Sequence, residues 1–268
     1  MFKEIRFLII VPTYNSSRIL GRLVKSLKNQ TFQNWKTIFI DAYSNKKNED
    51  LLFNYIKSDK RFSLKRETEE FKGIFPSMTL GAKSAVENDW VIFLGSDDWF
   101  SSSLSLEKMA RKILDTKKSN HDDLGILYKT QFLKSGNNKL LRYNKIPAKA
   151  FIDKKKLSSL MFFGYVPIHQ LICFSQRLLL KLMPYSDEYK LASDCALFFK
   201  FSRLSQWRLF ILDEVLINIQ AGGLSSRHFY RRIKEVLLIY WRKYKLYFII
   251  PFLLRYVRKF FLRIRNII

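Results

Sequence analysis

The fold class follows from one stretch of the chain, Trp90-Val91-Ile92-Phe93-Leu94-Gly95-Ser96-Asp97-Asp98-Trp99. Its first five residues are continuously apolar and rich in branched and aromatic side chains, which predicts a short buried strand. Two carboxylates follow at the carboxyl end of that strand, where open α/β sheets place their ligands. Asp97 and Asp98 therefore predict a site for a divalent cation that also holds substrate phosphates. The alternative is a turn that caps a helix beginning near Ser103.

Strand-like and helix-like segments alternate on both sides of this stretch. The strands are expected over residues 5–11, 37–40, 62–65 and 125–130. The helices are expected over residues 19–27, 51–57, 78–86 and 191–204, with Ser16 and Ser17 as caps of the first. Strands separated by helices of this length predict an α/β fold with a mostly parallel, doubly wound sheet. The turn Ser135-Gly136-Asn137-Asn138 predicts a hairpin after the 125–130 strand.

The composition indicates a folded protein of a reducing compartment. The chain has 268 residues, and its hydrophobic content of 48% excludes general disorder. The two cysteines, Cys173 and Cys195, have no metal-ligand spacing and are expected to be buried thiols. The apolar run Phe7–Val11 is too short for a secretory signal and is better explained as a strand. We therefore expect a cytoplasmic location.

The positive charge is large and unevenly distributed. The net charge is +25, and residues 227–268 hold 12 Lys and Arg residues against the single acid Glu235. Such asymmetry indicates an anionic partner surface, either nucleic acid or membrane. No nucleic-acid-binding motif accompanies the charge, so binding to nucleic acid is not expected.

The last segment of the chain predicts an amphipathic helix. After Pro251, apolar residues recur at helical spacing on one face, namely Leu254, Val257, Phe261, Ile264 and Ile268, and basic residues fill the rest. The longest uncharged stretch, Leu246–Leu254, is too short to span a bilayer. The pattern favours a helix that lies in an anionic membrane interface. The alternative is a helix packed on the catalytic domain or on a partner.

Several short motifs follow one another along the chain. Those of the first half are Val11-Pro12-Thr13-Tyr14-Asn15, Gln30-Thr31-Phe32, Ile40-Asp41-Ala42-Tyr43-Ser44, Gly73-Ile74-Phe75-Pro76-Ser77-Met78 and Phe93–Trp99. Those of the second half are His169-Gln170, Ala192-Ser193-Asp194 and Gly222-Gly223-Leu224-Ser225. In order and spacing, the set resembles the family 2 glycosyltransferases, and in particular a subgroup that builds bacterial surface polysaccharides.

The resemblance implies a GT-A fold and a transfer reaction. The catalytic domain would cover residues 1–226, followed by a basic amphipathic helical segment over residues 227–268 that associates with a membrane. The reaction would be metal-dependent, inverting transfer of a sugar from a nucleotide donor, UDP-linked, to a lipid-linked saccharide. Such acceptors lie at the cytoplasmic face of the bacterial inner membrane, where the protein would be peripheral. The sugar, the linkage and the oligomeric state stay open.

The same resemblance assigns roles to residues. Asp98 would hold Mn²⁺ or Mg²⁺, whose charge stabilises the departing diphosphate. Asp194 would be the general base for the acceptor hydroxyl. Contacts to the nucleotide are expected from Pro12, Thr13, Tyr14, Asn15, Asp41, Ser96 and Asp97. Contacts to the acceptor or the donor sugar are expected from Met78, His169, Gln170, Gly222 and Gly223. The alternatives are a turn-forming role for Asp41, a helix-surface position for Asp194 and a structural role for His169.

The chain also departs from the family pattern. Ala42 and Tyr43 stand where the family has two glycines, and Pro76, Leu80 and Gly95 stand where it has Asp, Lys and Asp. The losses at positions 76 and 80 affect expected contacts to the donor sugar and the diphosphate. They leave one further hypothesis, a catalytically degenerate homologue that acts as a partner subunit.

Overall fold

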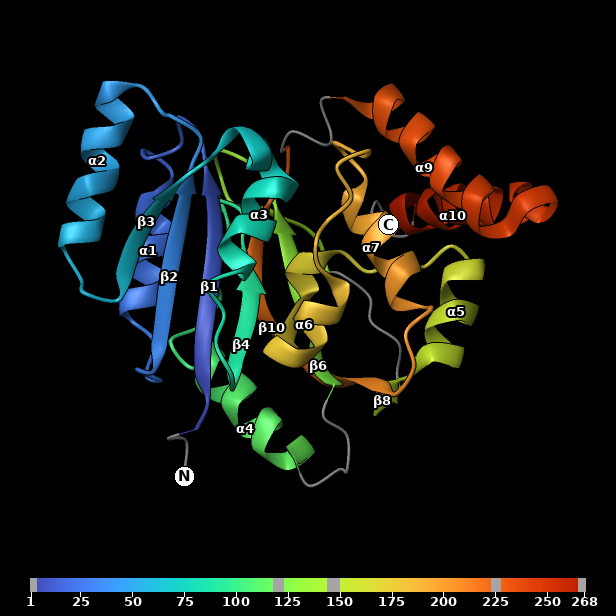
Figure 1. Cartoon of the computed structure of the whole chain (residues 1–268), viewed down its shortest axis with the longest axis horizontal. Helices are drawn as coiled ribbons and strands as arrows, with labels where there is room; N and C mark the ends of the chain where they lie inside the picture. The colour runs from blue at the N-terminus through green and yellow to red at the C-terminus, as the bar shows by residue number, and fades with distance from the viewer. Residues whose placement is uncertain (1–3, 118–122, 144–149, 223–227, 265–268) are drawn as a thin grey trace.

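The computed structural model describes residues 4–117, 123–143, 150–222 and 228–264. Within them, one sheet forms the centre of the molecule and helices cover both of its faces (Figure 1). The strands are β1 (Arg6–Thr13), β2 (Trp35–Asp41), β3 (Phe62–Arg66), β4 (Asp89–Phe93), β5 (Trp99–Phe100), β6 (Asp123–Leu133), β7 (Leu140–Tyr143), β8 (Phe151–Ile152), β9 (Ile172–Ser175) and β10 (Trp207–Gln220). The helices are α1 (Leu20–Lys28), α2 (Lys46–Lys57), α3 (Ile74–Ala82), α4 (Ser105–Lys117), α5 (Lys154–Phe162), α6 (Gln176–Leu182), α7 (Ser193–Phe201), α9 (Phe229–Tyr244) and α10 (Ile249–Ile264).

The sheet confirms the predicted α/β class and adds four strands that the sequence did not predict, β5, β8, β9 and β10. Across the sheet the order is β3-β2-β1-β4-β9-β6-β10-β5, with β7 on β6 and β8 on β10. β1 is parallel to β2 and β4, β2 is parallel to β3, and β6 is parallel to β10. β9 is antiparallel to β4 and β6 and so joins two parallel groups of strands. The predicted hairpin is present, since β7 returns antiparallel along β6.

The strand order reverses at β1, because β2 lies on one side of it and β4 on the other. In this parallel register Thr13 of β1 lies opposite Asp41 of β2, and Ile10 lies opposite Phe93 of β4. The loops that follow β1, β2 and β4 therefore leave from the same edge of the sheet. Open α/β sheets bind ligands at such a reversal, outside the carboxyl ends of the strands.

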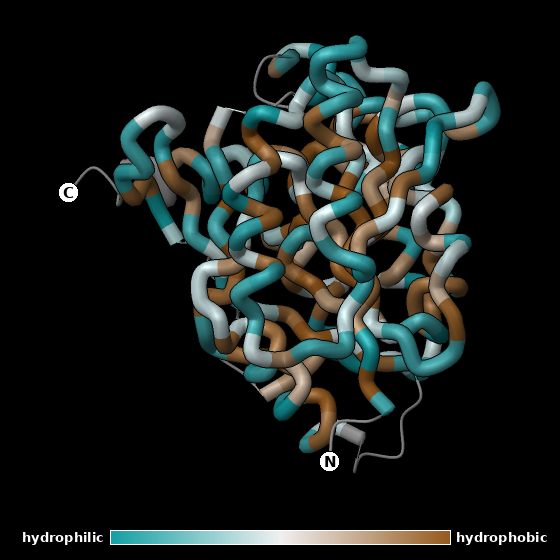
Figure 2. Tube along the Cα trace, turned by 90° about the vertical axis from the view of Figure 1, so that its left-hand side faces the viewer, coloured by the Kyte–Doolittle hydropathy of each residue, from teal (hydrophilic) through white to brown (hydrophobic). Residues whose placement is uncertain are grey.

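Both faces of β1 are buried, which explains its continuous apolar sequence. Phe7, Ile9 and Val11 pack in a cluster that includes buried residues of α1 and α4. Leu8 and Ile10 pack on the other face with residues of α3, α6 and α7. Figure 2 shows the hydrophobic segments running through the interior of the molecule.

Three helices have clearly other limits than the sequence predicts. α2 begins at Lys46, whereas the predicted helix covered 51–57. α3 begins at Ile74 and ends at Ala82, whereas the predicted helix covered 78–86. Gly73, with a φ of 108°, turns the chain into α3, and Pro76 falls in the first turn, where a missing amide N–H costs no helical bond. α7 spans Ser193–Phe201 instead of 191–204.

The predicted caps of the first helix are wrong. α1 begins at Leu20, and its N-cap is Ile19, which has no side-chain cap hydrogen bond. Ser17 is used elsewhere: its hydroxyl donates to the carbonyl of Asn48, and its amide donates to Asn48 Oδ1 over 3.2 Å. The serine thus fixes the loop after β1 to α2 rather than starting α1.

The C-terminal helices pack on the part of the fold formed by the second half of the chain. α9 contacts α7, and α10 contacts both α9 and α5, at the end of the molecule away from α2 (Figure 1). Val236, Ile239 and Tyr240 of α9 are buried in the core cluster that contains α7. None of the helices that the structure describes is long and apolar enough to span a membrane.

We predict that Gly81→Ala destabilises the protein by about 1–3 kcal/mol, because added core atoms force side chains and backbone to shift. A Cβ at Gly81 would lie 2.4 Å from Cγ2 of Ile10, so α3 could not rest on β1 unchanged. Gly21→Ala is the matched control, since its Cβ would meet only the hydroxyl of Tyr55 at 3.2 Å. Chemical denaturation measures both free energies of unfolding; equal stability of the two variants would contradict the packing argument.

Candidate active site

The loops after β1 and β2 are tied together by hydrogen bonds. The amide of Asn15 donates to the hydroxyl of Ser44 over 2.8 Å, and the amide of Asn45 donates to Asn15 Oδ1 over 2.9 Å. The amide of Ala42 donates to the carbonyl of Thr13 over 2.9 Å. The predicted nucleotide-binding residues 12–15 and Asp41 therefore form, with the rest of the 41–44 loop, one fixed surface at the reversal of the sheet.

Asp41 is fully buried beneath this surface. Its Oδ1 accepts hydrogen bonds from the hydroxyls of Thr13 and Ser44, over 3.1 and 2.6 Å. Its Oδ2 accepts the amide of Ser44 over 3.0 Å and forms an ion pair with Arg66 of β3. These four contacts use the usual acceptor capacity of a carboxylate. Arg66 also forms an ion pair with Glu49 of α2. Among the groups that donate to Asp41, Arg66 therefore keeps an anionic partner if Asp41 binds a ligand instead.

Two tyrosines project from the fixed surface into solvent. Tyr14 is 65% exposed and Tyr43 is 69% exposed. Tyr43 has a φ of 55°, in the left-handed region that costs a non-glycine residue about 1–2 kcal/mol. The structure thus explains why glycine suits this position in the family pattern. The sequence analysis did not include Tyr43 among the site residues, although this departure was the available signal.

Asp98 lies just beyond β4 and is 1% exposed. Its Oδ2 accepts the amide of Gly95 over 2.7 Å and the side-chain amide of Gln170 over 3.0 Å. Burial, together with the charge of Asp97, raises the pKa of Asp98 to about 7. Burial also raises the pKa of Asp97. A buried carboxylate, Asp98, and a half-buried one, Asp97, therefore lie side by side, and neither donor to Asp98 Oδ2 is charged.

Gly95 lies directly against this pair of carboxylates. A Cβ at position 95 would lie 2.8 Å from Asp97 Oδ1 and 3.1 Å from Asp98 Oδ2. The carboxylates fold back over the glycine, so a third carboxylate at this position would displace them. The glycine at position 95, where the family has Asp, thus leaves space for the Asp97 and Asp98 carboxylates as they lie here.

The residues at this place fit a divalent cation. A cation removes the electrostatic cost of two desolvated carboxylates, and Mg²⁺ is often bound by one or two carboxylates together with substrate phosphates. The described part of the chain contains no group of three or more His, Cys, Asp and Glu side chains suited to a metal. The remaining ligands would have to come from the substrate and from water.

A further carboxylate, Asp194, is the one that the family resemblance predicts as general base. Asp194 is in the first turn of α7, partly buried, and accepts the amide of Cys195 over 2.7 Å. Its charge acts on His169, Tyr185, Arg255 and Lys259, so Asp194 faces the interior of this region.

His169 lies next to Gln170 in the chain and is acted on by the charge of Asp194, so it connects the surroundings of Asp98 with those of Asp194. It precedes Gln170, the donor to Asp98, and the rings of Phe75, Phe93 and Tyr185 surround it with centroids 6.0 Å away. Burial lowers the pKa of His169 to about 4, against the opposing charge of Asp194, so the imidazole is neutral at pH 7. Among the described residues, neither ring nitrogen has a hydrogen-bond partner. Asp98, Gln170, His169 and Asp194 thus form one continuous region.

The other predicted site residues differ in burial and in their place in the fold. Pro12 and Ser96 are half-buried at the carboxyl ends of β1 and β4, and Met78 is buried in α3. Gly222 follows β10 with a φ of 104° and has open space where a side chain would be. Gly223 lies outside the described residues.

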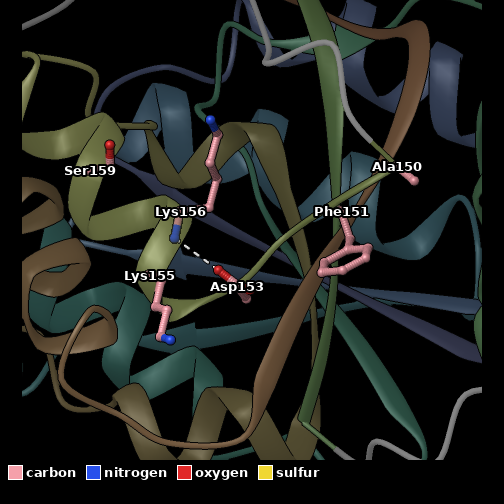
Figure 3. A pocket seen from close by; sticks show the side chains of 6 residues that line it. All are labelled: Ala150, Phe151, Asp153, Lys155, Lys156 and Ser159. Atoms are coloured by element: carbon pink, nitrogen blue, oxygen red, sulfur yellow. Dashed lines mark hydrogen bonds between the residues drawn. The ribbon is translucent and has the colours of Figure 1, made fainter.

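A cavity of about 510 Å³ lies elsewhere, beside β8 and α5, and is lined by Ala150, Phe151, Asp153, Lys155, Lys156 and Ser159 (Figure 3). Asp153 caps α5 by accepting the amide of Lys156 over 2.8 Å. None of the predicted site residues lines this cavity, so it is separate from the carboxylate region.

Comparisons with known proteins show the family of this chain. A sequence model described as Glycosyl transferase family 2 matches residues 8–164. The chain belongs to this family. It is 34% identical over 106 residues to an uncharacterized glycosyltransferase of Haemophilus influenzae, which is 40% of this chain and 41% of that protein. The chain thus spans less than half the length of this relative.

Two solved structures share the fold. S. aureus TarS 1-349 in complex with UDP-GlcNAc matches with a TM-score of 0.63 and 18% identity, over 90% of this chain and 68% of TarS. The mannosyltransferase PcManGT from Pyrobaculum calidifontis, in complex with GDP-Man and Mn²⁺, matches with a TM-score of 0.59 and 14% identity. That match covers 88% of this chain and 63% of PcManGT. The predicted GT-A fold of family 2 is confirmed.

We predict that Tyr43→Gly raises the free energy of unfolding by about 1 kcal/mol, because it relieves the left-handed backbone conformation at this residue. Tyr43→Ala is the matched control: it also removes the ring but keeps the strained backbone, and it gives no such gain. Urea denaturation followed by circular dichroism measures both. A Tyr43→Gly protein no more stable than Tyr43→Ala would show that the backbone is not strained here.

Proposed function

We propose that this protein is a metal-dependent, inverting glycosyltransferase that moves a sugar from a UDP-linked donor to a lipid-linked saccharide. The observation that carries the proposal is the buried carboxylate of Asp98, with a pKa of about 7, at the reversal of a family 2 sheet. The second carboxylate, Asp194, lies in the same region beyond His169. Supporting evidence comes from the TarS structure, which has the same fold and contains UDP-GlcNAc.

The donor would bind at the carboxyl ends of β1, β2 and β4. The exposed rings of Tyr14 and Tyr43 offer faces on which a nucleobase can stack. Asp41 can accept a hydrogen bond from the base when Arg66 shifts toward Glu49. The diphosphate would lie against Asp97 and Asp98, where a bound Mn²⁺ or Mg²⁺ supplies positive charge to the leaving group. Gln170 keeps the Asp98 carboxylate in place throughout.

The acceptor would bind between His169 and Asp194. Asp194 removes the proton of the acceptor hydroxyl as that oxygen attacks the anomeric carbon, and a single displacement inverts its configuration. His169 is neutral at pH 7, and its two buried ring nitrogens, which have no partner among the described residues, could bind a sugar hydroxyl once the acceptor uncovers them. Because His169 and Gln170 are neighbours in the chain, the donor side at Asp98 and the acceptor side at His169 keep a fixed position relative to each other.

The C-terminal helices provide a surface for a membrane. Between α9 and the end of α10, large apolar side chains are exposed on one side, namely Leu246, Ile249, Ile250, Leu253, Val257, Phe260 and Phe261. Lys and Arg residues flank them, as is typical of helices that lie in an anionic interface. A peripheral position at the cytoplasmic face of the inner membrane would bring lipid-linked acceptors to the site. Of the predicted apolar face, Val257 and Phe261 are exposed and Leu254 is half-buried.

We predict that binding of UDP in the presence of Mn²⁺ strengthens from pH 6 to pH 8. The pKa of Asp98 is raised to about 7, so below that pH the folded protein keeps a proton that the cation must displace. Calorimetric titrations across this range measure the affinity. Asp98→Asn is expected to abolish the metal dependence and its pH profile while the protein stays folded, because the substitution removes a buried charge. A variant that binds UDP and Mn²⁺ as the wild type does would overturn the metal assignment.

We predict that Asp194→Asn lowers sugar transfer by at least about a hundredfold, as expected for loss of a general base. Binding of UDP and Mn²⁺ should not change, because Asp194 lies on the acceptor side. Asp187→Asn, which removes a carboxylate from the nearby 184–192 segment, is the control and should transfer normally. Turnover of a panel of UDP-sugars with lipid-linked saccharides provides the assay; near-normal transfer by Asp194→Asn would exclude Asp194 as the base.

A further inference from the structure

Glu235 of α9 reaches across to the chain segment that leads into α7. Its Oε2 accepts the amides of Leu191 and Ala192 over 2.8 and 2.9 Å, and its Oε1 accepts the amide of Lys190 over 3.3 Å. The side chain of Glu235 is 12% exposed, so these hydrogen bonds lie mostly out of solvent. Hydrogen bonds to a charged acceptor are about twice as strong as neutral ones. One carboxylate therefore holds three consecutive backbone amides firmly.

The segment that Glu235 holds ends two residues before Asp194. Ala192 precedes the first residue of α7 and cannot cap the helix, since its side chain has no acceptor. Its amide donates to Glu235, while its carbonyl accepts a helical bond from the amide of Ala196 over 3.2 Å. The start of α7 is therefore fixed from α9, and Asp194 lies in the first turn after that fixed point.

A second contact between α9 and the same segment comes from Arg242. Its guanidinium donates to Tyr189 Oη over 2.8 Å and forms an ion pair with Glu188. Arg242 follows Glu235 by seven residues, which is about two helical turns, so both side chains leave the same face of α9. A shift of α9 along its axis would break both contacts. The segment 188–192 thus sets one position for α9, and α9 sets one position for the segment.

We propose that Glu235 is a positioning residue for the transfer reaction: it places Asp194 by holding the three amides that lead into α7. The inference rests on the proposed function, in which Asp194 takes the proton of the acceptor hydroxyl. General-base catalysis needs the base within hydrogen-bond distance of that hydroxyl, and a displacement of about 1 Å can cost about a hundredfold in rate. α9 is then part of the catalytic site and not only of the surface proposed for a membrane.

Two substitutions separate the reach of Glu235 from its charge. Glu235→Gln keeps the length of the side chain and leaves an oxygen that can still accept the amides of Leu191 and Ala192. Glu235→Asp keeps the charge but is one methylene group shorter, so its carboxylate does not reach these amides from α9. We expect near-normal kcat for Glu235→Gln and a loss of about tenfold to a hundredfold in kcat for Glu235→Asp. An unchanged kcat in Glu235→Asp, or the reverse order of the two variants, would overturn the proposal.

The donor side provides a readout that should not change. The KM for the UDP-sugar and the affinity for UDP with Mn²⁺ should stay at wild-type values in both variants, because Asp97 and Asp98 follow β4, on another element. Arg231→Gln is the matched control on α9. It removes the 3.4 Å ion pair of an exposed arginine with Glu235 and leaves the three amide contacts, so transfer should be normal.

A double-mutant cycle with Asp194→Asn tests whether Glu235 acts through the base. If it does, Glu235→Asp costs little further kcat once the carboxylate of Asp194 is gone, because residues that act as a unit are not additive. A merely structural role would lower the residual kcat of Asp194→Asn by the same factor as that of the wild type. That result would overturn the proposal.

Amide hydrogen exchange over residues 190–192 provides a readout without turnover. We expect faster exchange of these amides in Glu235→Asp than in the wild type, because their acceptor is out of reach. Equal exchange in the two proteins would overturn the proposal. Failure of the wild type to transfer from any UDP-sugar would instead contradict the proposed function, and the exchange measurement would still decide whether Glu235 holds the segment.

Discussion

The site is organised around the burial of one carboxylate, Asp98, at the carboxyl end of β4. Desolvation and the neighbouring Asp97 raise its pKa to about 7. At neutral pH, a bound proton or cation therefore offsets the unfavourable negative charge of this buried carboxylate. Gly95 gives both carboxylates the room they need, and Gln170 holds Asp98 from the other side. Because Gln170 follows His169, the arrangement that fixes Asp98 also positions the region that contains Asp194.

Much of this arrangement could be predicted from the sequence. The apolar runs of β1, β2 and β4 are continuous because both faces are buried, and the motifs at their ends carry Asp41, Asp97 and Asp98. The antiparallel β9 could not be predicted, because Ile172–Ser175 is a short apolar run with no periodicity of its own. Its position depends on pairing with β4 and β6, which are distant in the chain.

The structure also gives meaning to the departures from the family pattern. Gly95 avoids a contact that a third carboxylate would make, and Pro76 falls in the first turn of α3. For the C-terminal helices, helical spacing identified an amphipathic segment but could not say which side packs inward. That choice is set by packing, since Gly164 lets the backbone of α10 at Arg255 approach the end of α5.

The central claim is that Asp98 is the residue through which a metal ion joins the nucleotide to this sheet. Crystals of the protein grown with UDP and Mn²⁺, measured at the manganese absorption edge, locate the metal independently of any assay. We expect an anomalous peak within coordination distance of an Asp98 carboxylate oxygen and of the UDP diphosphate. Bound UDP without manganese at Asp98, or manganese at another place, would contradict it.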